Sequence, residues 1–142
     1  MRIARPEHLL ELLIFESLPL PEQVLQGVRD AKFTTCTPIQ SKSLPITLGK
    51  KDLAGQAQTG TGKTAAFLIT VFTRLLESTP PSAAKGKAGP RALIIAPTRE
   101  LARQIEKDAL LLGKHCQFRT VCVIGGVDYD KQRNEIKAGV DI

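Results

Sequence analysis

The sequence predicts an α/β protein in which a parallel sheet carries helices on both faces. Short apolar stretches alternate with longer segments whose apolar residues recur at helical spacing. Residues 92–96 are apolar throughout, as in a strand of a sheet that is covered on both faces. A glycine-rich loop, residues 57–64, joins a strand candidate to a helix candidate. Strands that alternate with helices in this way indicate a parallel, doubly wound sheet.

Two helices are expected before residue 35. Leucines cluster tightly enough in residues 6–14 for a short amphipathic helix, which we expect to be an appendage to the core fold. Pro21 suits the first turn of a second helix, which is expected to run to about residue 31. The apolar residues of this second helix fall on one side, at Val24, Leu25 and Val28.

The middle of the chain is expected to hold a third helix, a short strand and a long apolar helix. Thr37 followed by Pro38 is an N-cap with proline at the first helical position, so a helix is predicted to begin there. Pro45 is expected to kink or shorten this helix. Residues 52–57 are a strand candidate, and residues 63–76 leave so few polar positions that their helix should be largely buried.

The remaining segments continue the alternation. Residues 77–90 are rich in Pro, Gly, Ser and Lys, which predicts a mobile surface loop after the long helix. Thr98 is expected to cap a helix that runs to about residue 113. Three further elements are predicted, a strand over 119–124, a helix over 128–138 and the start of a strand at 140–142.

Composition limits the classes of protein that remain. The 142 residues suffice for one domain with a hydrophobic core, and the formal charge of +6 weakly favours a polyanionic partner. Cys36, Cys116 and Cys122 form no CxxC pair, which favours reduced, packed thiols over a zinc site or a disulfide framework. The sequence has no apolar run long enough for a membrane span and no signal-peptide pattern, so we expect a cytoplasmic protein without a membrane partner.

The glycine-rich loop carries the groups that a polyphosphate requires. Its glycines let backbone N–H groups approach phosphates closely, and the helix start that follows adds unpaired N–H donors and a positive dipole end. Lys63 supplies a charge for the β- and γ-phosphates, and the Thr64 hydroxyl can ligate Mg²⁺. Lys63 and Thr64 are therefore the candidate catalytic residues, and Thr64 is the candidate metal ligand. The alternative is a structural turn with an incidental lysine, which the strand–loop–helix context disfavours.

Four motifs, in order along the chain, resemble those of the DEAD-box group of superfamily-2 helicases. The loop reads A-x-x-G-x-G-K-T, with Ala57 in place of the usual first glycine. Residues 35–40, TCTPIQ, are similar to the Q motif of that family, with Phe15 at the usual upstream aromatic position. Residues 97–102, PTRELA, are similar to motif Ia, and the pair Gly125 and Gly126 matches the double-glycine motif that contacts RNA.

The resemblance implies a RecA-like P-loop NTPase domain of an ATP-dependent RNA helicase. Cys36 and residues 55–58 and 129–132 look most like the bacterial RhlB type, which belongs to the RNA degradosome. On this interpretation residues 1–14 are an N-terminal extension. Residues 15–142 are then a truncated first RecA-like domain with an incomplete sheet.

The resemblance also implies ATP and Mg²⁺ as ligands. A carboxamide both donates and accepts hydrogen bonds, so Gln40 can read the adenine edge at two positions, and Phe15 can stack on the base. The expected ATP-binding residues are Phe15, Gln40, Gln58, Thr59, Gly60, Thr61, Gly62, Lys63, Thr64 and Ala65.

RNA is the implied macromolecular partner. Thr98 and Arg99 lie at a helix start, where side chains and backbone N–H groups can grip a phosphate, and Gln132 is expected to support the double-glycine loop. Phosphate and sugar contacts carry no base information, so sequence-independent binding is predicted. The expected RNA-binding residues are Pro97, Thr98, Arg99, Gly125 and Gly126.

The last expectations concern the motifs that this sequence lacks, its further partners and the alternative functions. The sequence lacks the acidic motif that the family uses for hydrolysis and lacks its second motor domain, so this chain is expected to bind nucleotide without hydrolysing it. Exposed strand edges favour self-association, and RNA degradosome proteins are further candidate partners. The alternatives are a DNA helicase of the same superfamily and a non-catalytic nucleotide-binding interaction module; the Q motif and motif Ia favour the RNA group.

Overall fold

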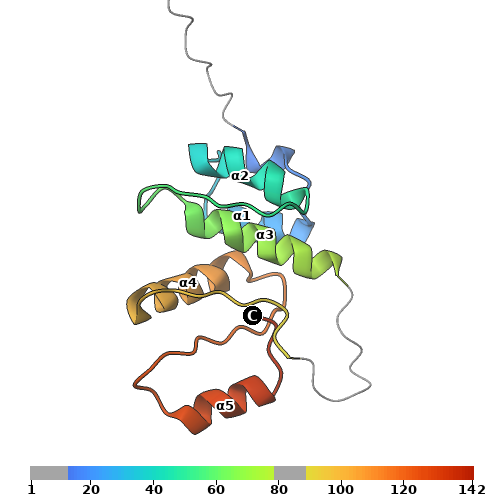
Figure 1. The fold of residues 1–142 in the computed structure, drawn as a ribbon. Coiled ribbons are helices and arrows are strands. Elements are labelled where there is room, and N and C mark those ends of the chain that lie inside the picture. Colours follow the sequence, from blue (N-terminus) through green and yellow to red (C-terminus); the bar gives the residue numbers. More distant parts are fainter. Residues whose placement is uncertain (1–12, 79–88) are drawn as a thin grey trace, which may run out of the picture.

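A computed structural model describes residues 13–78 and 89–142 as a stack of helices joined by irregular chain (Figure 1). The central helix α3 packs against α1, α2 and α4, and α1 also packs against α4. Helix α5 packs against no other described helix and lies apart from the stack in Figure 1. The elements are η1 (Phe15–Ser17), α1 (Glu22–Asp30), α2 (Pro38–Leu48), α3 (Lys63–Glu77), α4 (Arg99–Leu112) and α5 (Tyr129–Lys137).

The structure confirms five predicted helices, and two other predictions fall outside the residues that it describes. The helices expected from about residues 21, 38, 63 and 98 are α1, α2, α3 and α4, and the helix expected over 128–138 is α5. The helix predicted over 6–14 and most of the loop predicted over 77–90 fall outside the described residues. Within the described ranges, none of the helices is long and apolar enough to cross a bilayer.

Helix α3 forms the centre of the hydrophobic core. Leu68 and Ile69 are 0% exposed and Phe72 is 1% exposed, which confirms the prediction of a largely buried helix. Each such side chain contributes about 1.5–3 kcal/mol when it leaves water. Cys36 and Cys116 are also buried and belong to this core, as expected for packed thiols. The core therefore fixes the helix whose first turn follows the glycine-rich loop.

Of the two effects predicted for Pro45, a kink or a shortening of α2, the shortening at Pro45 is not seen. The helix continues to Leu48, although proline removes one backbone donor. Contacts with α3 support this last turn: the hydroxyls of Thr47 and Thr70 lie 2.8 Å apart, and Arg74 donates to the carbonyl oxygen of Thr47 at 3.0 Å. Leu44 is 0% exposed on the same side. Packing on α3 thus outweighs the local effect of the proline.

Helices α1 and α4 approach each other at a glycine. A β-carbon added to Gly27 would lie 1.9 Å from the backbone carbonyl oxygen of Leu112, a distance that no side chain can occupy. Val24 and Val28 flank Gly27 on α1 and are 0% and 1% exposed. The absence of a side chain at Gly27 therefore sets how closely the two helices pack.

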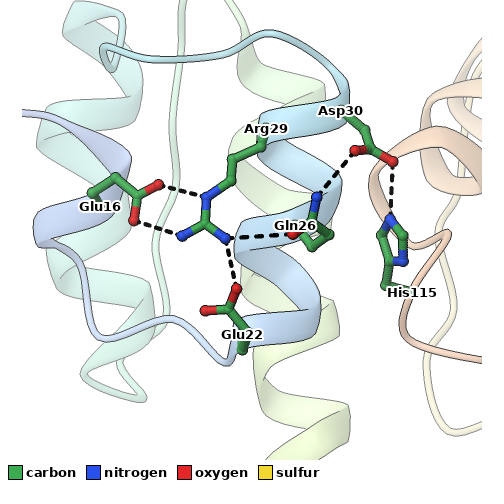
Figure 2. A network of polar contacts seen from close by, with 6 residues as sticks. All are labelled: Glu16, Glu22, Gln26, Arg29, Asp30 and His115. Atoms are coloured by element: carbon green, nitrogen blue, oxygen red, sulfur yellow. Dashed lines mark hydrogen bonds and ion pairs between the residues drawn. The ribbon is translucent and has the colours of Figure 1, made fainter.

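A charged cluster at the surface of α1 adds polar contacts to this packing (Figure 2). The Arg29 guanidinium donates to both carboxylate oxygens of Glu16, at 2.7 and 3.0 Å, and to Glu22 at 2.6 Å. The Arg29 hydrogen bond lowers the pKa of the Glu16 carboxyl below its usual value. These groups are exposed to solvent, where ion pairs stabilise a fold only slightly.

Asp30 links the end of α1 to the turn that follows α4. Its carboxylate oxygen Oδ2 lies 2.9 Å from Nε2 of His115, and Oδ1 accepts a hydrogen bond from Gln26 at 3.3 Å (Figure 2). Lys114 donates to the same carboxylate at 3.3 Å. The hydrogen bond from His115, followed by those from Gln26 and Lys114, lowers the pKa of Asp30 to about 2.

The predicted parallel sheet is not formed within residues 13–78 and 89–142, where no strand is assigned. Its first pairings are nevertheless present at the C-terminal residues. The N–H groups of Arg91 and Ala92 donate to the carbonyl oxygen of Asp141 at 2.8 and 3.0 Å. On the other side, Asp141 N–H donates to the carbonyl oxygen of Arg119 at 2.7 Å, and Val121 N–H donates to that of Ile142 at 3.1 Å.

Residues 92–96 are covered on one face, not on two as predicted. Leu93 and Ile95 are 81% and 84% exposed, whereas Ile94 and Ala96 pack against the core. A groove of about 440 Å³ runs between this segment and residues 120–124. Strands persist where a neighbouring backbone takes up their N–H and C=O groups, and in the described chain such a backbone reaches only one end of each segment. Residues 52–57 likewise have no pairing partner among the described segments, and Leu53 is 43% exposed.

Candidate functional site

The glycine-rich loop runs directly into the first turn of α3. Gly60 and Gly62 have φ angles of +77° and +90°, a region that favours glycine. Nothing lies within 4 Å of the position that a β-carbon of Gly60 would occupy, so the backbone there is open to a ligand. The Thr61 hydroxyl donates to the carbonyl oxygen of Gln58 at 2.8 Å and closes the turn. Thr59 lies in the same turn.

Lys63 folds back across this loop. Its ammonium group donates to the backbone carbonyl oxygens of Ala57 and Gln58. Thr64 and Ala65 follow in the first helical turn, where backbone N–H groups have no acceptor within the helix. A phosphate is a stronger acceptor than two neutral carbonyl oxygens because the hydrogen bond then joins opposite charges. The loop therefore places an ammonium group and free N–H donors where a polyphosphate can engage both.

Gln40 ties the start of α2 to the end of the loop. Its side-chain oxygen accepts a hydrogen bond from the Thr37 N–H at 2.8 Å, and its Nε2 donates to the carbonyl oxygen of Gly62 at 3.1 Å. The Thr37 hydroxyl donates to the carbonyl oxygen of Thr61 at 2.8 Å. A β-carbon on Gly62 would lie 2.4 Å from Gln40 Nε2, so this close approach requires glycine. Two hydrogen bonds, to the carbonyl oxygens of Thr61 and Gly62, thus couple the start of α2 to the loop, and the bond from the Thr37 N–H holds the Gln40 side chain in place.

These contacts leave Gln40 with capacity for a further ligand. A carboxamide oxygen has two lone pairs and its nitrogen has two hydrogens, and each atom uses one of them here. The side chain is 3% exposed, however, so a purine edge must approach through a narrow opening. The predicted reading of adenine by Gln40 stays a prediction with this geometric condition attached.

The two aromatic rings near the start of the chain have different environments. Phe15 is 2% exposed and belongs to the core, and its ring is stacked on that of Phe33 with centroids 6.2 Å apart. Phe33 is 40% exposed. Of these two rings, the one that faces solvent is therefore that of Phe33, which is not among the expected ATP-binding residues. Stacking of a base on Phe15 stays a prediction.

Thr64 is the candidate magnesium ligand. Its side chain is partly buried in the first turn of α3, next to Lys63. The described residues contain no group of three His, Cys, Asp or Glu side chains placed to hold a metal ion. Mg²⁺ commonly keeps several waters and binds through few protein ligands together with phosphate oxygens. The Thr64 hydroxyl fits that mode, with nucleotide phosphates and water as the other ligands.

A second cluster of predicted residues gathers at the start of α4. Pro97, Thr98 and Arg99 are exposed, as are both residues of the double-glycine turn, Gly125 and Gly126. The Arg99 guanidinium lies against that turn, since a β-carbon on Gly126 would be 2.8 Å from Arg99 Nη1. The fold therefore brings together two segments that are more than twenty residues apart in the sequence.

The start of α4 is a suitable place for an anion. Thr98 is the N-cap, as predicted, and its hydroxyl accepts from the Leu101 N–H at 3.2 Å. The neighbouring N–H groups of the first turn have no partner within the helix, and the dipole of α4 adds positive potential there. Arg99 contributes a full charge beside them. A phosphodiester group fits this edge by charge and by hydrogen bonding.

The role of the Thr37 hydroxyl in the glycine-rich loop was not predicted. The sequence does carry a signal for half of the arrangement, because Thr37 and Gln40 have the spacing of a capping box. The bond from the Thr37 hydroxyl to Thr61 joins residues far apart in the chain, and no local pattern indicates it.

Comparisons with known proteins identify the family and several relatives of this chain. A family model described as DEAD/DEAH box helicase matches residues 37–142. The chain is 56% identical over 128 residues to an ATP-dependent RNA helicase RhlB of Shewanella pealeana, and 53% identical to one of Shewanella oneidensis. In both cases the match covers 90% of this chain and 29% of the relative, so the chain spans less than a third of the length of these proteins.

Two solved structures resemble the fold. One is the RNA helicase Prp28 from Chaetomium thermophilum bound to ADP, with a TM-score of 0.76 and 37% identity over 87% of this chain and 30% of that one. The other is a DEAD box protein from Methanococcus jannaschii, with a TM-score of 0.77 and 29% identity over 91% of this chain and 33% of that one. The described fold is therefore similar to the corresponding part of these helicases.

Proposed function

The chain belongs to the DEAD/DEAH box helicase family, and from this membership we propose that it is the ATP-binding part of a motor that remodels or unwinds RNA duplexes. The observation that carries the proposal is the coupling between the loop and α2. Gln40 is hydrogen-bonded to the carbonyl oxygen of Gly62, the residue directly before Lys63. A group suited to a purine edge and a group suited to phosphates are thus held in one unit.

In this proposal ATP binds along the loop. Lys63 exchanges the carbonyl oxygens of Ala57 and Gln58 for the β- and γ-phosphates, and the N–H groups at the start of α3 donate to the same phosphates. Thr64 holds Mg²⁺ together with phosphate oxygens. Gln40 recognises the adenine edge with the donor and acceptor capacity that its internal bonds leave free.

RNA binds at the other cluster, through its backbone. Pro97, Thr98 and Arg99 at the start of α4 and the adjacent double-glycine turn supply one charge, a hydroxyl and backbone N–H groups. None of these groups selects a base, so binding is independent of sequence and weakens steeply as salt rises. The exposed apolar side chains of Leu93 and Ile95 support self-association. Contacts with RNA degradosome proteins, a cytoplasmic location and the absence of turnover by the isolated chain stay predictions of the sequence.

The test is ATP turnover by the full-length protein with single-stranded RNA or with DNA of the same sequence. The proposal predicts stimulation by RNA, and loss of turnover in Lys63→Ala because the phosphates lose their ammonium partner. Arg99→Ala is expected to raise the RNA concentration that gives half-maximal stimulation about tenfold. Lys107→Ala is the matched control, since Lys107 is an exposed charge on the same helix. Stimulation by DNA but not by RNA would refute the proposal in favour of a DNA motor.

A further inference from the structure

We propose that Gln132 is a positioning residue that sets the shape of the double-glycine turn and so aligns it with Arg99 for RNA. This inference rests on the proposed RNA contact of that turn. Gln132 itself touches no ligand in this proposal; it acts through the backbone of residues 124–128.

The carboxamide of Gln132 is buried and therefore needs hydrogen-bond partners. Helix α5 packs against no other described helix, and Gln132 is its one buried residue, at 8% exposure. A buried carboxamide is costly unless its polar atoms are bonded. Here they are bonded, but to the chain that precedes α5: Oε1 accepts from the Ile124 N–H at 2.8 Å, and Nε2 lies 3.4 Å from the carbonyl oxygens of Val127 and Asp128.

These bonds span the double-glycine turn. Ile124 directly precedes Gly125, and Val127 directly follows Gly126, so one side chain holds both ends of the turn. The bonds also fix the orientation of the carboxamide, because an N–H requires the oxygen and a carbonyl requires the nitrogen. We call the hydrogen bonds from Gln132 to Ile124, Val127 and Asp128 the clamp. Gly126, which lies between these bonded ends, has a φ of +81°.

The clamp determines how the turn faces α4. The Arg99 guanidinium lies against Gly126, with Nη1 2.8 Å from the position that a β-carbon would occupy. If the clamp opens, the backbone of the turn moves relative to the Arg99 guanidinium, and the two no longer meet one phosphate together. Productive contacts depend on such alignment within fractions of an ångström.

The helix itself does not need Gln132 for its start. Asp128 caps α5, because its carboxylate accepts from the Lys131 N–H at 3.0 Å. A methionine at position 132 would fill nearly the same space without the hydrogen bonds. Gln132→Met is therefore expected to loosen the turn while leaving α5 and the distant glycine-rich loop in place.

The experiment uses the full-length protein and a fluorescent single-stranded RNA, with Gln132→Met compared with Gln104→Met, the same change at an exposed position of α4. We expect the RNA dissociation constant of Gln132→Met to rise about tenfold, because the turn loses its clamp. The ATP dissociation constant should stay within about twofold and the Tm within about 3 °C of the unaltered protein. Gln104→Met should change none of the three.

A double variant tests whether Gln132 affects RNA binding through the edge that contains Arg99. Because Gln132 acts through the edge that Arg99 shares, Gln132→Met combined with Arg99→Ala should weaken RNA binding less than the product of the two single losses. Multiplicative losses would overturn the proposal, and so would unchanged RNA affinity in Gln132→Met. A fall in Tm with parallel losses of ATP and RNA affinity would assign Gln132 to stability alone and overturn it as well.

Amide hydrogen exchange of the unaltered protein tests the clamp without a substitution, so it remains informative if Gln132→Met fails to fold. The Ile124 amide hydrogen is bonded to a buried side chain, so it should exchange with solvent slowly, whereas the exposed amides of Gly125 and Gly126 should exchange fast. Fast exchange at Ile124 would contradict the clamp. An unaltered protein that binds no RNA would refute both the proposed function and the role of Gln132. RNA binding that depends on Arg99 but not on Gln132 would refute only the role of Gln132.

Discussion

The side-chain nitrogen of Gln40 lies 3.1 Å from the carbonyl oxygen of Gly62 and donates a hydrogen bond to it. This bond joins the first turn of α2 to the residue before Lys63. Because the oxygen of the same carboxamide accepts from the Thr37 N–H, a change at Gln40 is transmitted to both segments. The end of the loop is thus shaped by a residue that precedes Gly62 by 22 positions.

Replacing Gln40 should destabilise the fold as well as alter nucleotide binding. Gln40→Ala leaves the Thr37 N–H and the Gly62 carbonyl oxygen without their partner at a site that is 3% exposed. We expect the free energy of unfolding to fall by about 1–3 kcal/mol. Urea unfolding measures this, with Gln104→Ala on the surface of α4 as the control. Equal stability of the two variants would show that the bonds to Gln40 are not formed in solution.

Gly27→Ala should disrupt the packing of α1 on α4. The added methyl group would lie 1.9 Å from the Leu112 carbonyl oxygen, and neither backbone can move without opening the core. We expect a loss of about 1–3 kcal/mol in the free energy of unfolding, despite the higher helix propensity of alanine. Gly55→Ala is the matched control, because no atom lies within 4 Å of that added methyl group. Thermal unfolding that ranks the two variants in the opposite order would contradict the close approach of the helices.

Asp30 should make stability depend on pH in the acid range. The pKa of its carboxyl is lowered to about 2, chiefly by the His115 hydrogen bond, from about 3.9 in an unfolded chain. The ionised form therefore stabilises the folded state above about pH 4, and this contribution is lost as the pH falls towards 2. Asp30→Asn should flatten the decrease of Tm over that window.

The pKa of Asp108 is shifted in the opposite direction to that of Asp30. Burial raises the pKa of its carboxyl, so protonation of this group favours the folded state as the pH falls. Asp108→Asn should therefore leave a steeper decrease of Tm below pH 4, and Asp30→Asn a shallower one. Parallel curves for the two variants would mean that neither carboxylate has the environment described here.

Local chemistry was enough to predict helices α1 to α5. The apolar run of α3 predicted a buried helix, and Thr98 predicted the start of α4, because both signals act within a few residues. The sheet was different. Strands 92–96 and 119–124 were expected, yet each requires a neighbour from elsewhere in the chain, and only Asp141 and Ile142 supply one in the described residues.

In the candidate sites, too, features with a local sequence signal were predicted, and features set by tertiary packing were not. The sequence identified the loop with Lys63 and Thr64, and it identified both segments that meet at Arg99. It did not indicate that the Phe15 ring would be inside and the Phe33 ring outside, since both are aromatic and only tertiary packing decides their exposure. The bond between Thr37 and Thr61 was missed for the same reason.

The most direct test of the account is the calorimetric affinity of ATP for the full-length protein and for a variant that carries both Lys63→Ala and Gln40→Ala. The double variant is expected to bind ATP at least about a hundredfold more weakly, because the phosphates and the base each lose a partner. The control variant, Lys107→Ala with Gln104→Ala, should bind ATP like the unaltered protein. Equal affinity for ATP in the unaltered protein and in the Lys63→Ala, Gln40→Ala variant would contradict the account.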